Sequence, residues 1–209
     1  MKKLLIAASV LMLSFSSISK AQTFQTGSLI VSAGYGFDIY KVKLHQVNNY
    51  SNQTKDTTSG AASGNFNLGG EFGVTKWLGL GVQLKFDSYL HNSNVSQAGG
   101  FEGGLIVNAH IVRHLHFDLL AGLNLGASSL TVTSNDGSNT QIYGNGSWAD
   151  IHFTARIYFG KFGVSATLYF PMINYTLSSN NSLINEYLDD SWKATGEGLN
   201  FGIQYHFLR

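Results

Sequence analysis

The stretch LNFGIQYHF at Leu199–Phe207 sets large apolar side chains at every second position and small or polar ones between them. Successive side chains of a β-strand point to opposite faces, so the pattern predicts a strand that separates two different environments. In a transmembrane β-barrel the apolar face meets lipid and the other face lines the lumen. The stretch therefore indicates a strand of such a barrel.

The same two-residue alternation recurs along the chain and predicts an all-β fold, an eight-stranded antiparallel up-and-down transmembrane β-barrel. The expected strands are residues 26–38, 62–74, 77–89, 99–112, 114–128, 148–159, 162–170 and 195–207. Tight turns are expected at 75–76, 113 and 160–161, and long polar loops at 39–61, 90–98, 129–147 and 171–194. We expect Pro171 to end the seventh strand, because proline is excluded from the interior of paired strands.

The composition favours a membrane protein. Charged residues make up 12% of the chain, against roughly 25% in a typical soluble domain. After residue 21 no apolar run approaches the length of a membrane-spanning helix. Lipid offers the backbone no hydrogen-bond partners, so a closed barrel is the remaining way to cross. Because the chain has no cysteine, it has no disulfide, lipoprotein anchor or thiolate metal site.

The amino terminus predicts secretion. Met1-Lys2-Lys3, an apolar run and Ser19-Lys20-Ala21 form the three regions of a signal peptide, residues 1–21, cleaved after Ala21. The alternative, a transmembrane helix, is disfavoured because the apolar run is short of the roughly 20 residues required. The mature domain, residues 22–209, then has ten basic and twelve acidic residues, a formal charge of −2, and no basic footprint for nucleic acid.

The ends of the predicted strands are rich in aromatic residues, as the two interfacial girdles of a membrane barrel require. The residues assigned to the girdles are Trp77, Phe101, Trp148, Phe159, Phe162 and Phe170.

Charged residues lie on the predicted lumen face, where burial is costly unless the ions are paired. The predicted lumen charge network comprises Glu71, Lys85, Glu102, Asp118 and Arg156. Two salt bridges are expected, Lys85 with Glu102 and Arg156 with Asp118, because each pair lies at similar height on neighbouring strands. These ions would plug a lumen that is only wide enough for side chains or one small ligand. The alternative is that they face water in a hydrated pore.

The histidines are the residues to consider for a metal site or a catalytic site. His110 and His116 are expected on the lumen face and His114 in a turn, and no carboxylate-rich motif completes a metal site. His152 and Asp150 share a face, but it points to the lumen, and no serine stands in a nucleophile motif. The sequence therefore predicts no metal, no cofactor and no catalytic residue.

With its signal, strand count and loop asymmetry, the chain resembles the small eight-stranded bacterial outer-membrane proteins of the OmpX, OmpW and OmpA membrane-domain type. The terminal strand resembles the signal read by the barrel-assembly machinery, which implies that role for Tyr205 and Phe207. The resemblance implies a location in the bacterial outer membrane. The implied partners are outer-membrane lipids, the assembly machinery during biogenesis and an unknown ligand of the external loops.

The leading functional hypothesis is a non-enzymatic integral barrel with four external loops, acting in envelope integrity or surface interaction. A small channel for ions or compact solutes is the first alternative, and a continuous plug or a water-connected path would decide between them. An outer-membrane lipid-modifying enzyme and a soluble barrel of the lipocalin or streptavidin kind are further alternatives. The enzyme would need a serine, histidine and acid together on the lipid face.

Overall fold

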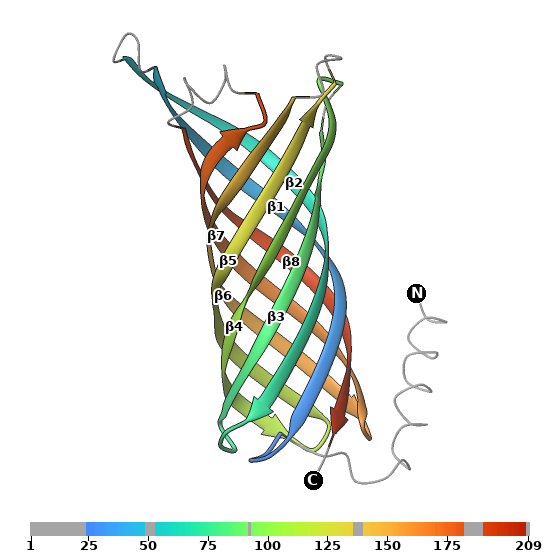
Figure 1. Ribbon diagram of the computed structural model, residues 1–209. Coiled ribbons are helices and arrows are strands. Elements are labelled where there is room, and N and C mark those ends of the chain that lie inside the picture. Colours follow the sequence, from blue (N-terminus) through green and yellow to red (C-terminus); the bar gives the residue numbers. More distant parts are fainter. Residues whose placement is uncertain (1–23, 49–52, 92, 136–139, 182–189, 208–209) are drawn as a thin grey trace, which may run out of the picture.

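The computed structural model describes residues 24–48, 53–91, 93–135, 140–181 and 190–207, so the predicted signal peptide lies outside the described part. Eight antiparallel strands follow one another around a closed barrel, with β8 hydrogen-bonded to β1 (Figure 1). The strands are β1 Leu29–Asn48, β2 Gln53–Gly73, β3 Leu78–Tyr89, β4 Val95–His114, β5 Phe117–Ser134, β6 Gln141–Phe159, β7 Phe162–Ser179 and β8 Ser191–Phe207. The predicted fold class is confirmed.

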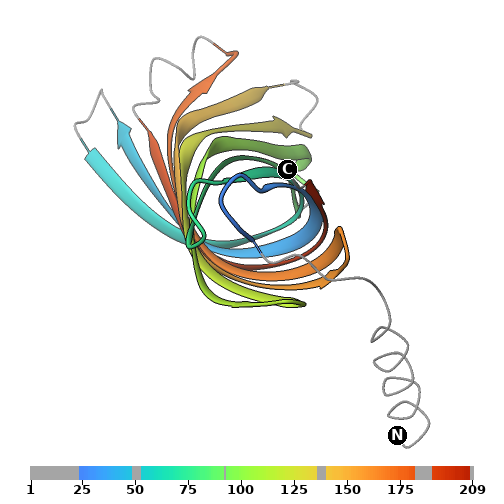
Figure 2. The same ribbon diagram turned by 90° about the horizontal axis from the view of Figure 1, so that it is seen from below.

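The two ends of the barrel differ. At the turn end, short connections join β2 to β3, β4 to β5 and β6 to β7 through residues 74–77, 115–116 and 160–161. The last of these turns uses Gly160 at φ 69°, a left-handed conformation that favours glycine. β1 starts and β8 finishes at this end, and Figures 1 and 2 show the chain entering and leaving the barrel there. We call the opposite end the loop end.

The two faces of the wall follow the predicted alternation. Apolar side chains stand exposed on the outside, among them Phe37, Phe86, Leu105 and Phe153. Within the eight strands, the buried charged side chains are Asp38, Glu71, Lys85, Asp87, Glu102, Asp118, Asp150 and Arg156. None of the described residues forms a helix long and apolar enough to span a membrane. An apolar exterior around a polar interior reverses the arrangement of a soluble barrel, so lipid is the environment that this wall suits.

The strands run much further toward the loop end than the sequence predicts. Most of the segments 39–61, 129–147 and 171–194, predicted as loops, are paired strand. β1 has 20 residues, roughly 66 Å at about 3.3 Å per residue, whereas a tilted membrane strand needs about 9–11. Beyond the apolar belt the outer face of a strand meets water, while Tyr40, Val42, Leu130 and Tyr175 remain buried on the inner face. The pattern of apolar residues on the outside therefore ends there although the hydrogen-bond ladder continues.

Pro171 lies inside β7 rather than at its end, which corrects the prediction. The residue still pairs with Asp150 of β6. On the other side the ladder to β8 breaks, since paired positions jump from Tyr169–Gly198 to Met172–Thr195. Proline has no N–H to donate, and at this gap the ladder requires no such hydrogen bond. Pro171 is therefore still kept out of a fully paired position, although the strand continues past it.

The turn between β4 and β5 lies two residues further along than predicted. His114 is the last residue of β4, and His116 is an exposed turn residue rather than a lumen residue. A register shift between His110 and Val112 inserts one extra residue, Ile111, into β4. Such a bulge shifts the alternation by one position, which a strict period of two cannot anticipate.

Most of the aromatic residues assigned to the girdle have their side chains on the outside of the barrel. Trp77 and Phe162 are 49% and 65% exposed, Phe101 and Phe170 are also exposed, and Phe159 is partly exposed. Trp148 is the exception, because its side chain is only 2% exposed and lies inside the barrel. Its even number already places it on the lumen face with Asp150, so its position in the alternation should have outweighed its aromatic character.

This difference gives a direct test with two double variants that each retain one tryptophan. With Trp148 and Trp192 replaced by phenylalanine, Trp77 should be quenched strongly by brominated acyl chains, because its ring faces lipid. With Trp77 and Trp192 replaced, Trp148 should keep its emission in the same vesicles, because strand β6 screens it. The measurement is fluorescence of the refolded proteins in brominated and unbrominated vesicles. Equal quenching of the two would place Trp148 on the lipid face.

Candidate functional site

One buried lysine lies close to three carboxylates inside the barrel, in the half of the membrane region that is nearer the loop end. Lys85 Nζ lies 2.8 Å from Asp38, 2.9 Å from Glu102 and 3.4 Å from Asp87. Lys85 and Asp87 lie on β3, Glu102 on β4 and Asp38 on β1, so this lysine cluster joins strands on one side of the ring. The predicted pair of Lys85 and Glu102 is present, and these residues are direct partners in the β3–β4 ladder.

Neutral groups complete the lysine cluster. The Tyr40 hydroxyl donates to Asp38 at 2.8 Å and accepts from Lys85 at 3.2 Å. The Ser63 hydroxyl donates to Asp87 at 2.9 Å, and the Asn65 amide donates to Asp38 at 3.1 Å. With one ammonium and three carboxylates, the cluster has two more acidic groups than basic ones. Its single cation therefore stabilises more than one buried acid.

An apolar cap closes the lumen on the loop-end side of the lysine cluster. The cap consists of Tyr40, Val42, Tyr89, Leu130, Trp148, Ile173, Tyr175 and Ala194, all buried and packed together. These side chains come from strands around the barrel, and the Tyr40 and Tyr89 rings lie 6.1 Å apart. The hydroxyls of Tyr175 and Ser128 are hydrogen-bonded at 2.6 Å. Tyr40 joins this cap to the lysine cluster beneath it.

A second set of ions closes the turn end. Arg156 Nη2 lies 2.7 Å from Glu71, and Arg156 Nη1 lies 3.8 Å from Asp118. The predicted pair with Asp118 is thus within 4 Å, but the shorter contact is with Glu71. His110 lies between the same acids, with Nδ1 2.7 Å from Asp118 and Nε2 2.8 Å from Glu71. Because both imidazole nitrogens face carboxylates, this arginine cluster suits a doubly protonated ring and balanced charge.

The segment Phe24–Ser28 lies across the turn end of the lumen, and its Phe24 side chain is inserted over the arginine cluster. The Phe24 ring is fully buried and stacks on His110, with ring centroids 3.6 Å apart and planes at 12°. Arg113 donates to the Phe24 carbonyl at 3.2 Å. The Gly27 N–H donates to the Gly73 carbonyl at 2.8 Å, and Gly27 has φ 83°. We call this segment the N-terminal stopper.

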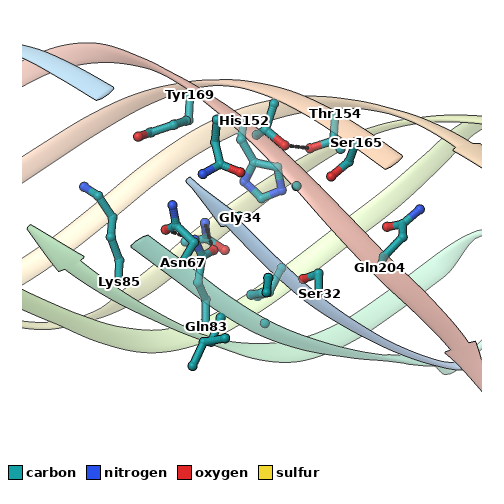
Figure 3. Close-up of a pocket in the computed structure, with 18 of the residues that line it drawn as sticks. Ser32, Gly34, Asn67, Gln83, Lys85, His152, Thr154, Ser165, Tyr169 and Gln204 are labelled. Atoms are coloured by element: carbon teal, nitrogen blue, oxygen red, sulfur yellow. Dashed lines mark hydrogen bonds between the residues drawn. The ribbon is translucent and has the colours of Figure 1, made fainter. Parts of the chain in front are cut away.

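A polar chamber of about 90 Å³ remains between the two ion clusters. In Figure 3, Lys85 and Tyr169 lie toward one end of the chamber and Gln204 toward the other. Side-chain amides line it in a hydrogen-bonded series, in which Asn124 donates to Gln83 and Gln83 donates to Asn67. The volume and polarity suit several water molecules. The lumen between the two ion clusters is therefore a small polar space rather than a solid core.

Glycines on the lumen face leave room for the buried carboxylates, because they have no Cβ. A Cβ at Gly79 would lie 1.9 Å from the Glu71 carboxylate, and a Cβ at Gly198 would lie 2.0 Å from the Asp38 carboxylate. Either contact is far inside the van der Waals distance. The glycine-rich character of the lumen face is thus what lets two ion clusters fit into a narrow barrel.

His152 does not form a catalytic arrangement with a serine. Its Nδ1 lies 3.2 Å from Asp150 and its Nε2 lies 2.9 Å from the Asn108 amide oxygen, so both nitrogens face acceptors of the lumen. Across the described residues, no group of three or more histidine, cysteine, aspartate or glutamate side chains is arranged to hold a metal ion.

The sequence prediction missed several residues of this site. Asp38 and Asp87 have the parity of the lumen face, so alternation could have found them. His110 was placed in the lumen but not between two acids, and Phe24 precedes the first predicted strand. Nothing in the local sequence pattern indicates that Phe24 enters the barrel.

The predicted assembly residues lie at the turn end of β8. Phe207 is exposed, and its ring packs edge-on against Tyr205 with centroids 4.6 Å apart. Tyr205 also meets Phe162 of β7 at 5.0 Å. These rings form part of the outer wall at this end.

Comparisons with known proteins concern the fold. No protein-family model matches the sequence, and a search of curated proteins finds no match. Among solved structures, the outer membrane protein OprG from Pseudomonas aeruginosa has a TM-score of 0.62 and 12% identity, over 89% of this chain and 98% of that one. The outer membrane protein AlkL has a TM-score of 0.55 and 10% identity, over 91% and 95%.

The outer membrane protease OmpT from Escherichia coli is also similar, with a TM-score of 0.51 and 10% identity over 92% of this chain and 100% of that one. Proteins of different activity therefore share this architecture, and the likeness carries no activity over. Together with the closed barrel and its apolar exterior, these similarities identify the architecture. The chain has the fold of the small bacterial outer-membrane β-barrels.

Proposed function

We propose that this chain is a non-enzymatic integral protein of the bacterial outer membrane, with a closed lumen and a role in envelope integrity or surface interaction. Cleavage after Ala21 would release a mature chain in which Phe24 is the third residue. The turn end would face the periplasm and the loop end the outside, as in bacterial barrels with short periplasmic turns. Tyr205 and Phe207 would serve recognition by the barrel-assembly machinery, and the external loops would meet an unknown ligand.

The observation that carries the proposal is the double closure of the lumen. A solute entering from the loop end meets the apolar cap and then the lysine cluster. One entering from the turn end meets the N-terminal stopper and then the arginine cluster. Passage would require separation of buried ion pairs at both ends, which is costly where the ions have no water to replace their partners.

The test is the conductance of the refolded mature protein in a planar bilayer. Wild type should show no steady current, because both closures must open together for ions to pass. Glu102→Gln and Arg156→Gln, measured in parallel, should also stay silent, because each change leaves the closure at the other end of the lumen intact. Arg156→Gln should in addition lose stability, since it removes the cation between Glu71 and Asp118. A large porin added to each membrane at the end provides the positive control. A steady wild-type conductance would contradict the proposal and favour a channel.

The channel remains the second candidate because the chamber is polar. Its amides and hydroxyls could hydrate a compact solute once the closures had moved. An enzyme is disfavoured because both ring nitrogens of His152 have partners, Asp150 and Asn108, so neither nitrogen is left to activate a serine hydroxyl.

A further inference from the structure

Three lysines share one small area on the outer wall at the loop end. Lys43 of β1 and Lys193 of β8 are direct partners in the β1–β8 ladder, and Lys41 lies two residues from Lys43 on the same face. All three side chains are exposed. Opposed side chains on one face lie about 4.5–5.5 Å apart at Cβ. We call Lys41, Lys43 and Lys193 the lysine triad.

Like charges directly opposite each other destabilise a sheet unless a counter-ion neutralises them. Among the described residues, no carboxylate lies within 4.0 Å of any ammonium of the triad. Asp56, one step further toward the loop end, is already paired with His45 at 2.6 Å. Glu197 faces outward opposite Ile39, nearer the apolar belt. Among the residues that the structure describes, the acids near the triad therefore do not balance its positive charge.

The position of the triad relative to the apolar belt suggests the missing anion. Tyr35, Phe37 and Ile39 are the outward residues of β1 before Lys41, and they are 66%, 52% and 56% exposed. The apolar surface thus ends one outward position below the first lysine. Lysine stems lie along apolar surface while their ammonium groups reach the polar layer beside it. At this height the polar layer is formed by lipid headgroups.

We propose that the lysine triad binds the phosphate groups of phosphorylated glycolipid in the outer leaflet. A headgroup with two phosphates could meet the opposed Lys43 and Lys193 through one phosphate and Lys41 through the other. The inference rests on the proposed membrane location and orientation, but it does not depend on whether the lumen conducts. Binding would anchor the extended β1 and β8 strands to the lipid surface.

The test is lipid binding by the refolded mature protein in zwitterionic detergent, measured by native mass spectrometry. The probes are diphosphoryl lipid A and the same lipid with both phosphates removed. Wild type should bind the diphosphoryl lipid, more weakly as salt rises, and should not retain the dephosphorylated one. Replacing lysine by glutamine should lower affinity about fivefold for each site, and about a hundredfold for all three together.

Matched variants distinguish lipid binding at the triad from nonspecific attraction to any exposed lysine. Lys55→Gln changes an exposed lysine at the loop end that is outside the triad, and Lys161→Gln changes one at the turn end; both should bind as wild type does. A triple Lys→Arg variant should retain binding. Heat-modified gel mobility checks that every variant is folded. Equal binding of the dephosphorylated lipid, an equal loss in Lys55→Gln, or preferential binding of a sulfated polysaccharide over lipid A would overturn the proposal. A conducting lumen would leave this result unchanged.

Discussion

Lys85→Met should be among the most damaging single changes in this protein, with a loss of roughly 3–5 kcal/mol in the free energy of unfolding. The methionine side chain fills much of the same space but carries no charge. Asp38, Asp87 and Glu102 would then remain buried around an apolar group without their shared cation. A buried charge that loses its partner pays the full cost of desolvation.

Glu102→Gln should behave very differently although it breaks the same ion pair. The glutamine amide oxygen can still accept a hydrogen bond from Lys85, and the cluster then holds two acids for one cation. Its excess of acidic groups falls rather than rises. We expect a change within about 1 kcal/mol, the net value of an ordinary hydrogen bond. The double variant Lys85→Met/Glu102→Gln should therefore recover part of the loss of the single lysine variant.

The measurement is urea unfolding of refolded protein in lipid vesicles, followed by tryptophan fluorescence. Lys55→Met is the control, because it removes an exposed lysine and should change stability by less than about 0.5 kcal/mol. Equal losses in Lys85→Met and Glu102→Gln would show that the ion pair alone matters. They would rule out the charge imbalance as the determining feature.

The lumen shows which part of such a site the sequence can predict. Strand parity places Lys85, Glu102, Asp118 and Arg156 inside, and the ladder makes Lys85–Glu102 and Asp118–Arg156 direct neighbours. These contacts are local to adjacent strands, so counting along the chain is enough. The same reasoning could have found Asp87, two residues from Lys85 on the same face.

Counting residues along the chain cannot predict contacts between strands that are not adjacent. Arg156 on β6 reaches Glu71 on the opposite strand β2, and Lys85 on β3 reaches past β2 to Asp38 on β1. Which strands face each other across a barrel depends on its closure, tilt and stagger, which are properties of the whole ring. A long side chain then bonds to whichever acid lies across the narrow interior. Asp38 was also not predicted as a lumen residue, because it is the last residue of the first predicted strand.

Phe24→Ala should release the N-terminal stopper while the barrel itself remains folded. Removing a fully buried phenylalanine ring typically costs about 3–5 kcal/mol. The stopper lies before β1 and is joined to the barrel by few hydrogen bonds, so the loss should appear as local opening rather than global unfolding. The open state should become at least about a hundred times more populated, because each 1.4 kcal/mol changes an equilibrium tenfold.

The measurement is amide hydrogen exchange at Gly27, whose N–H donates to the Gly73 carbonyl only while the stopper is seated. Exchange there should accelerate about a hundredfold or more, following the population of the open state. Amides in the centre of β5 should keep wild-type protection. Phe162→Ala is the control, since it removes an aromatic ring from the outside of the same end. Unchanged exchange at Gly27 in Phe24→Ala would show that the ring does not hold the segment.

Phe24→Ala also tests whether opening one end of the lumen is enough to let ions pass through the whole barrel. With the stopper released, the chamber would open toward the turn end past the arginine cluster, but the lysine cluster and the apolar cap would remain. Two closures in series block current when either one is intact. Phe24→Ala should therefore stay silent in a planar bilayer despite its fast exchange at Gly27. A steady current from this variant would mean that the cap leaks, and that Phe24 alone keeps the wild-type barrel closed.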